Sequence, residues 1–245
     1  MKELTSRNFE ERLKLHAEAF HPVVPFNEND RFLLMDFTEN NQELSTEILA
    51  DTVLFTNWVN QKLNAAGARY GIGGYNEHRM VYSRSKVFDT GDTTEPRRLH
   101  LGMDIWGPPY TKVMAPMDGI VHSFAFNNAF GDYGATIILS HQLEGKTFYT
   151  LYGHLSLNSI KNVQEGDLVK RGEVFAEFGI PFENGSWPPH LHFQIIINMD
   201  RGKGDYPGVC KFSERSSYLE NSPDPDLILG MMDRVEGMRV NKLTT

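Results

Sequence analysis

Short runs of β-forming residues follow one another along most of the chain after residue 78, and this pattern constrains the fold more than any other feature. The runs are separated by glycine, proline, asparagine and aspartate, which favour turns. Strands at such short spacing are typical of an antiparallel β domain, either a sandwich or a barrel. The runs are MVYSRSKVF, KVMAP, GIVHSFAF, ATIILSH, TFYTLYGHL, EVFAEFG and LHFQIII.

The first 75 residues have a different pattern and predict mostly helix. Residues 7–19 place apolar side chains among charges at roughly helical spacing. The stretch 45–67 opens with Ser-Thr and a nearby glutamate and ends at a glycine, which predicts one capped helix. Residues 31–38 resemble a short strand.

These patterns divide the chain into three parts. We expect a mostly helical N-terminal extension over residues 1–75, a β-rich domain over 76–200, and a loop-rich segment with a possible short helix over 201–245. The predicted fold class is therefore mainly β and α+β overall, with an antiparallel sandwich- or barrel-like core.

Composition and charge argue against several classes of protein. The 245 residues carry a formal charge of −8 and no long basic run, so we expect no nucleic-acid partner. No segment approaches the roughly 18 consecutive apolar residues of a membrane helix, so we expect no membrane partner.

The single cysteine, Cys210, excludes an intrachain disulfide or a Cys-rich zinc site. No secretory signal is recognisable, which favours a cytoplasmic location unless a signal has been removed. The oligomeric state stays open.

Four of the nine histidines have contexts that reinforce one another. His190 and His192 flank one leucine in a β-rich run, so both rings project from one face of a strand. His100 and Asp104 are four residues apart and share a face in either a helix or a strand. His154 follows a glycine at the end of an aromatic strand, where it can reach into a cleft. We expect the other histidines to be structural or exposed: His16, His21, His78, His122 and His141.

These residue types point to a catalytic metal site. Imidazole nitrogen and carboxylate oxygen bind Zn²⁺ at about 2.0–2.2 Å. Ligation by His100, Asp104 and one of the last two histidines would leave one tetrahedral position open, which distinguishes a catalytic zinc from a structural one. The remaining histidines could then handle protons. A thermolysin-like helix site is not expected, because the sequence has no His-Glu-x-x-His.

Five motifs between about residues 98 and 197 occur in the order found in the lysostaphin/LytM-type zinc metallopeptidases, which cleave peptidoglycan, and the chain resembles this family there. The motifs are HLGMD, VMAPMDGIVHSF, YGHLS, VQEGDLVKRGEVFAEFG and PPHLHFQI. The resemblance implies that His100, Asp104 and His192 bind one Zn²⁺ per chain and that His154 and His190 are the catalytic histidines. It implies a zinc metallopeptidase that hydrolyses an amide bond with a metal-activated water. Which of the two histidines is the general base is left open.

The chain also departs from the family pattern. Trp187 and two prolines precede the last histidine pair where small residues are usual, so Trp187 could stack on substrate or cover the core. Glu77 and Arg79 lie beside a glycine turn outside the usual domain. They could reach the site as substrate-binding or supporting groups, or form a salt bridge at the surface.

Three other functions are compatible with parts of the sequence. The same fold could serve as a catalytically silent binding or regulatory module, although the complete set of five residues argues against it. A small cytosolic amide is a rival to peptidoglycan-like peptides as substrate. A biotinyl, lipoyl or phosphocarrier domain would share the glycine-flanked hairpin, but it would leave His100 and Asp104 unexplained.

Overall fold

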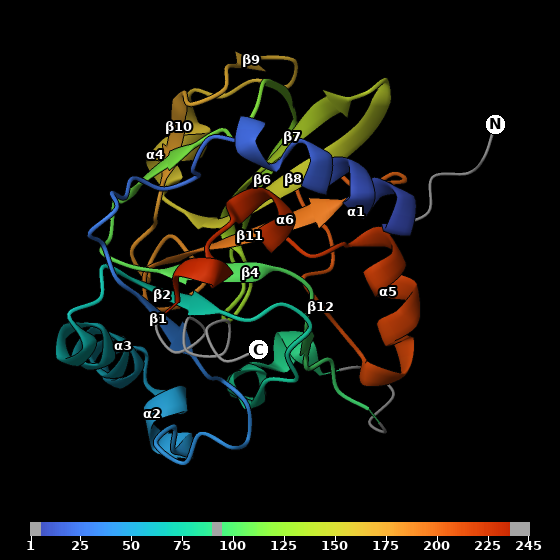
Figure 1. Ribbon diagram of the computed structural model, residues 1–245. Helices are drawn as coiled ribbons and strands as arrows, with labels where there is room; N and C mark the ends of the chain where they lie inside the picture. Colours follow the sequence, from blue (N-terminus) through green and yellow to red (C-terminus); the bar gives the residue numbers. More distant parts are fainter. Residues whose placement is uncertain (1–5, 90–94, 236–245) are drawn as a thin grey trace, which may run out of the picture.

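The computed structural model describes residues 6–89 and 95–235, and an eight-stranded sheet organises them (Figure 1). Every neighbouring pair in this sheet is antiparallel except β1 and β2, which are parallel. The strands in spatial order are β1 Phe32–Met35, β2 Tyr70–Gly73, β4 Met103–Trp106, β11 His190–Ile196, β8 Lys146–Leu155, β7 Gly134–Leu143, β6 Gly119–Asn127 and β9 Leu168–Val169.

Two short antiparallel pairs complete the β structure. They are β5 Lys112–Met114 with β10 Val174–Glu177, and β3 Leu99–His100 with β12 Val209–Cys210. The prediction of a mainly β, antiparallel core is confirmed. Within the described residues the large sheet is open, because its end strands β1 and β9 do not pair with each other.

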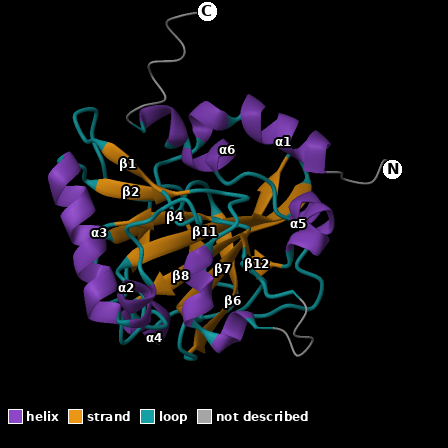
Figure 2. Cartoon of the chain, turned by 90° about the horizontal axis from the view of Figure 1, so that it is seen from below, coloured by secondary structure: helices purple, strands orange, loops and turns teal. Residues whose placement is uncertain are grey.

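The helices lie around the periphery of the sheet (Figure 2). The α-helices are α1 Ser6–Leu15, α2 Thr46–Ala50, α3 Thr52–Ala66, α4 Leu157–Lys161, α5 Arg215–Asn221 and α6 Asp226–Leu229. Short 3₁₀ turns are η1 Ala17–Ala19, η2 Met80–Arg84, η3 Lys86–Phe88, η4 Phe212–Glu214 and η5 Met232–Arg234. Among the described residues no helix is long and apolar enough to cross a membrane.

The single helix predicted over residues 45–67 is two helices in the structure. Ser45 caps α2 by accepting a hydrogen bond from the Ile48 N–H. Asp51 then starts α3, because its carboxylate accepts from the N–H groups of Val53 and Leu54 and its own backbone is extended. Gly67 ends α3 in the left-handed conformation, as the sequence predicts. An aspartate inside the predicted helix therefore acts as a second N-cap.

The N-terminal 75 residues contribute strands to the main sheet as well as helices. Strand β2 pairs with β4, and the register places Gly73 opposite Asp104. Strand β1 extends the sheet by one further strand. The C-terminal part of the chain contributes α5 and α6. The three-part division made from the sequence stays a prediction, but the first part and the β-rich part share one sheet.

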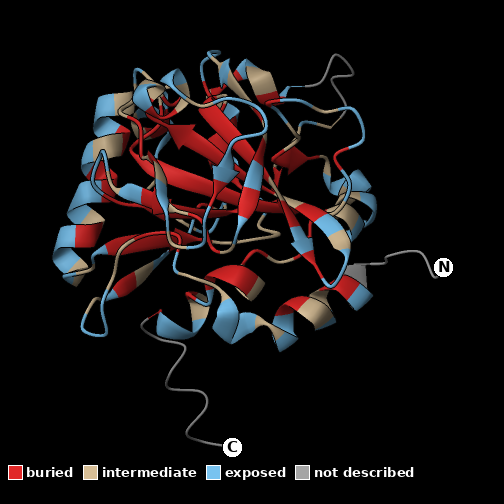
Figure 3. Cartoon of the chain, turned by 90° about the horizontal axis from the view of Figure 1, so that it is seen from above, coloured by how far each residue is buried: buried red, intermediate tan, exposed pale blue. Residues whose placement is uncertain are grey.

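The core lies on both faces of the sheet, and the central strand β11 is buried along its whole length (Figure 3). Its neighbours β4 and β8 are also largely buried. A strand covered on both faces holds its side chains in fixed rotamers, because close-packed neighbours exclude alternatives. Any group that β11 carries is therefore held rigidly.

A substitution at Gly134, at the start of β7, can test how tightly β7 packs against the loop that contains Glu183 and Asn184. Its φ is +63°, and an added Cβ would lie 2.2 Å from the carbonyl oxygen of Glu183. We expect Gly134→Ala to lower the free energy of unfolding by more than 3 kcal/mol, since it adds a steric clash to the roughly 1–2 kcal/mol left-handed cost. Gly145→Ala is the control, because Gly145 has φ +74° and no atom near an added Cβ. Urea denaturation measures both, and equal losses would contradict this account.

Candidate metal centre and active site

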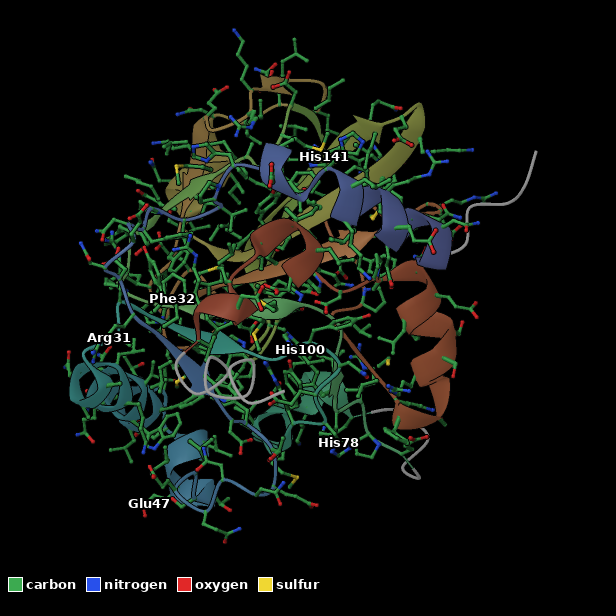
Figure 4. All side chains as sticks on the ribbon, viewed as in Figure 1. Arg31, Phe32, Glu47, His78, His100 and His141 are labelled. Carbon is green, nitrogen blue, oxygen red and sulfur yellow. The ribbon has the colours of Figure 1, made fainter. Side chains whose placement is uncertain are left out.

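His100, Asp104 and His192 converge at one point inside the protein. His100 Nε2 lies 3.0 Å from His192 Nδ1 and 3.2 Å from Asp104 Oδ1, and the last two atoms are 3.1 Å apart. All three residues are buried, and Figure 4 shows His100 in the interior of the molecule. Asp104 and His192 stand directly opposite each other on β4 and β11. The sheet register therefore builds most of this cluster.

Outer hydrogen bonds fix which nitrogen of each imidazole faces the cluster. His100 Nδ1 donates to the carbonyl of Gly74 at 2.9 Å. His192 Nε2 donates to Gln194 Oε1 at 3.1 Å, and the Gln194 amide nitrogen is itself used in bonds to Pro207 O and Ser222 Oγ. Each imidazole therefore turns a lone pair towards the other and towards the Asp104 carboxylate.

Three acceptors that face one another without a proton between them fit a cation. Burial lowers the pKa of His100 to about 4, so its ring is neutral at pH 7, the form that binds a metal. Burial opposes the charge on Asp104, but neighbouring charge, including that of the Arg79 guanidinium, holds the pKa of its carboxyl well below the usual value. Two imidazoles and one carboxylate are a donor set that Zn²⁺ accepts, with room for a further ligand.

His154 and His190 lie beside this cluster, with ring centroids 4.1 Å apart. His154 Nδ1 donates to Asn184 O, and His190 Nδ1 donates to Pro188 O, each at 2.8 Å. These bonds leave Nε2 of each ring as the free, basic nitrogen. Burial lowers the pKa of His190 to about 4 and that of His154 well below its usual value. Both rings are therefore neutral at pH 7.

The backbone of His154 is in the left-handed region, with φ +61°. Such a conformation costs a non-glycine residue about 1–3 kcal/mol and is concentrated at functional sites. The structure thus brings together all five residues singled out from the sequence. Their individual roles as ligands or catalysts stay predictions.

Arg79 is buried beside the metal cluster and is not a surface residue, since its side chain is only 1% exposed. Its guanidinium donates to Asp104 Oδ2, to Glu77 Oε2 at 2.6 Å and to the carbonyl of Gly74 at 3.3 Å. The interpretation as a surface salt bridge is therefore wrong. The reason is the register of β2, which places Gly73 opposite Asp104 and so brings the following turn to the cluster. Arg79 holds the oxygen of Asp104 that points away from the histidines.

Trp187 is also buried, and it packs against the aromatic rings of Phe55 and Tyr82. It lines a cavity of about 190 Å³ that also reaches His154 and His192. Trp187 therefore both covers part of the core and forms a wall of this cavity.

Two residues at the site were not singled out from the sequence. Gln194 supports His192, and its position two residues further along β11 was a usable signal, because it shares a face with both histidines. The hydroxyl of Tyr133 lies 3.4 Å from His192 Nε2. No local spacing connects Tyr133 to the histidines, so only the fold reveals it.

Arg79 also offers a test of the buried ion pair. We expect Arg79→Met to lower the free energy of unfolding by about 3–5 kcal/mol in the presence of a chelator, since it leaves the carboxylate of Asp104 buried without its cation. Lys203→Met is the control, because Lys203 and Glu165 form an ion pair with both side chains exposed, and such pairs contribute about 0–1 kcal/mol. Urea denaturation of both variants measures the difference, and similar losses would refute the assignment.

Part of the chain is similar to known proteins. Residues 98–203 match peptidase family M23. An uncharacterized metalloprotease of Haemophilus influenzae is 37% identical over 126 residues, which are 51% of this chain and 24% of that protein, so the chain spans about a quarter of the relative's length.

Solved structures were also matched. The match to a zinc-containing peptidase of Vibrio cholerae has a TM-score of 0.33 and 28% sequence identity, and it covers 44% of this chain and 30% of the peptidase chain. The match to the catalytic domain of lysostaphin from Staphylococcus simulans has a TM-score of 0.39 and 24% sequence identity, and it covers 66% of this chain and 96% of the lysostaphin domain. Residues 98–203, which contain His100, Asp104 and His192, are therefore similar to peptidase family M23.

Proposed function

We propose that this protein is a zinc-dependent peptidase that hydrolyses an amide bond. The observation that carries the proposal is the set of three buried lone pairs on His100, Asp104 and His192, which face one another within 3.2 Å. About 3.3 Å separates neighbouring ligands around a tetrahedral ion with bonds of about 2.0 Å, so little movement is needed to bind it. One Zn²⁺ per chain is expected.

The bound ion would supply Lewis acidity, which acidifies a water molecule and polarises the scissile carbonyl. The chain's own residues do the remaining work. His154 and His190 present free Nε2 atoms on one side of the ligand cluster, so either can take a proton from the attacking water and return it to the leaving amine. Their Nδ1–H bonds to backbone carbonyls keep both rings oriented for this transfer.

The substrate class is the less constrained part of the proposal. The match of residues 98–203 to a peptidase family supports a peptide, and the resemblance of the motifs to those of lysostaphin-type enzymes supports a peptidoglycan-like peptide cleaved internally. A small amide is the second candidate, because the cavity beside the histidines has only about 190 Å³. A silent binding module is less well supported, since it would not need the strained backbone of His154.

Metal content tests the ligand set directly. We expect about one zinc per chain in protein purified without chelator, and loss of that zinc in Asp104→Ala and His192→Ala, because each removes one of three ligands. His122→Ala is the control, since His122 lies on β6 and bonds to Ser123 outside the cluster. Elemental analysis of the four proteins gives the result. A wild-type protein that takes up no zinc at neutral pH would rule out the proposal.

Proton transfer is tested by His154→Gln and His190→Asn. We expect each to retain zinc and to lower kcat for peptide hydrolysis by about 10²–10⁴-fold, the usual contribution of a positioned acid or base. Single-turnover kinetics with glycine-rich peptides, together with zinc analysis, measure both quantities. If one variant keeps the wild-type rate, that histidine is not a proton carrier.

A further inference from the structure

The cavity beside His154 and His192 limits what can approach the metal cluster. Its volume of about 190 Å³ is below the roughly 300–1,000 Å³ of pockets that hold drug-sized ligands. Tyr82 and Trp187 line it as well, and both are buried. The space therefore fits one amino-acid side chain or the end of a peptide chain.

The cavity has a buried wall and a more exposed rim. The wall carries His154, His192, Tyr133 and Trp187, all buried. The backbone of Gly208 closes it, because an added Cβ there would lie 1.9 Å from the Tyr133 hydroxyl oxygen and 3.3 Å from the His192 ring. The rim is less buried and carries the charged side chains, which are Asp132, Asp205 and Arg97.

Two carboxylates and one guanidinium give the rim of the cavity a net negative charge. Arg97 donates to the carbonyl of Val87 and lies over the ring of Phe88, 5.8 Å from its centroid. Asp132 Oδ1 accepts the backbone N–H of Tyr133 at 2.8 Å. Within residues 6–89 and 95–235, neither Asp132 nor Asp205 forms a side-chain salt bridge. Burial, together with the charge of Asp205, raises the pKa of Asp132, and the backbone N–H of Tyr133 and the charge of Arg97 only partly oppose this rise.

A polar atom on the buried wall also lacks a partner. Among the described residues, Trp187 Nε1 is buried with no hydrogen-bond partner. A buried donor without an acceptor costs about 1–3 kcal/mol, so such atoms mark places where a ligand can bind. The wall of the cavity therefore has a free hydrogen-bond donor, and its rim has two carboxylates, Asp132 and Asp205.

We infer that this cavity binds an ammonium group of the substrate, held by Asp132 and Asp205 next to the bond that is cleaved. The inference rests on the proposed function and narrows its substrate class. An ammonium group is small enough for the cavity and forms charge-assisted hydrogen bonds to carboxylates. It comes either from a free N-terminus or from the side chain of a lysine-like residue.

Three matched peptides distinguish these sources. All have the same glycine-rich sequence: one has a free N-terminus and norleucine, one is acetylated with lysine, and one is acetylated with norleucine. With the zinc-loaded enzyme we expect kcat/KM to be at least tenfold higher for one of the amine-bearing peptides than for the amine-free peptide.

This difference in kcat/KM between the peptides should be lost in Asp132→Asn and in Asp205→Asn. Asp200→Asn is the control, because it removes the same charge at an exposed position outside the cavity lining. Equal cleavage of all three peptides, or an advantage that both cavity variants keep, overturns the inference and leaves the peptidase proposal intact.

A binding measurement separates this inference from the proposed function. Glycinamide and lysine amide are titrated into the zinc-loaded protein and followed by NMR. We expect a Kd at least tenfold weaker in the two cavity variants and weaker binding in 0.5 M salt. Binding without hydrolysis of any peptide would support the ammonium site and refute the peptidase. The same Kd in wild type and variants, or no binding at all, would refute the ammonium site.

Discussion

Lone pairs of His100, His192 and Asp104 face one another inside this protein. None of the three groups can donate a hydrogen bond to the other two, because each presents an acceptor atom. Folding such a cluster without a cation is unfavourable, since buried acceptors without donors lose their hydration. The outer atoms of the cluster are therefore all paired. Gly74 accepts from His100, Gln194 accepts from His192, and Arg79 donates to Asp104. These contacts use the outer atoms of the three groups and leave their inner atoms directed at one another.

Strand β11 explains how one short segment supplies several parts of the site. Its residues alternate between the two faces of the sheet, so His190, His192 and Gln194 share one face. His192 faces the metal cluster and Gln194 orients it, while His190 lies over Trp106, its direct neighbour on β4, with ring centroids 3.9 Å apart. The same register places Asp104 opposite His192. Because β11 is central and buried, small displacements of these rings are resisted from both faces.

The sequence predicts what depends on local spacing, and it fails where distant segments meet. His100 and Asp104, and the pair at 190 and 192, are recognisable because their spacing fixes a shared face. For Arg79 the sequence leaves two alternatives open, the site or the surface, because its position depends on the pairing of β2 with β4. The parallel pairing of β1 with β2 was equally hidden, since alternation of side chains says nothing about strand direction. The break at Asp51 was missed because a second cap inside a helical pattern is a weak signal.

The N-terminal helices are connected to the chemistry through a layer of aromatic rings. Phe55 of α3 packs against Trp106 and Trp187, with ring centroids 6.0 and 6.3 Å away. Trp106 in turn stacks on His190, and Trp187 lies 6.1 Å from the ring of His154. Rings of this size each bury about 150–250 Å², so the layer is a large part of what holds the two histidines in place. Helix α3 therefore supports the site structurally, because the rings that it covers are the rings that contact His154 and His190.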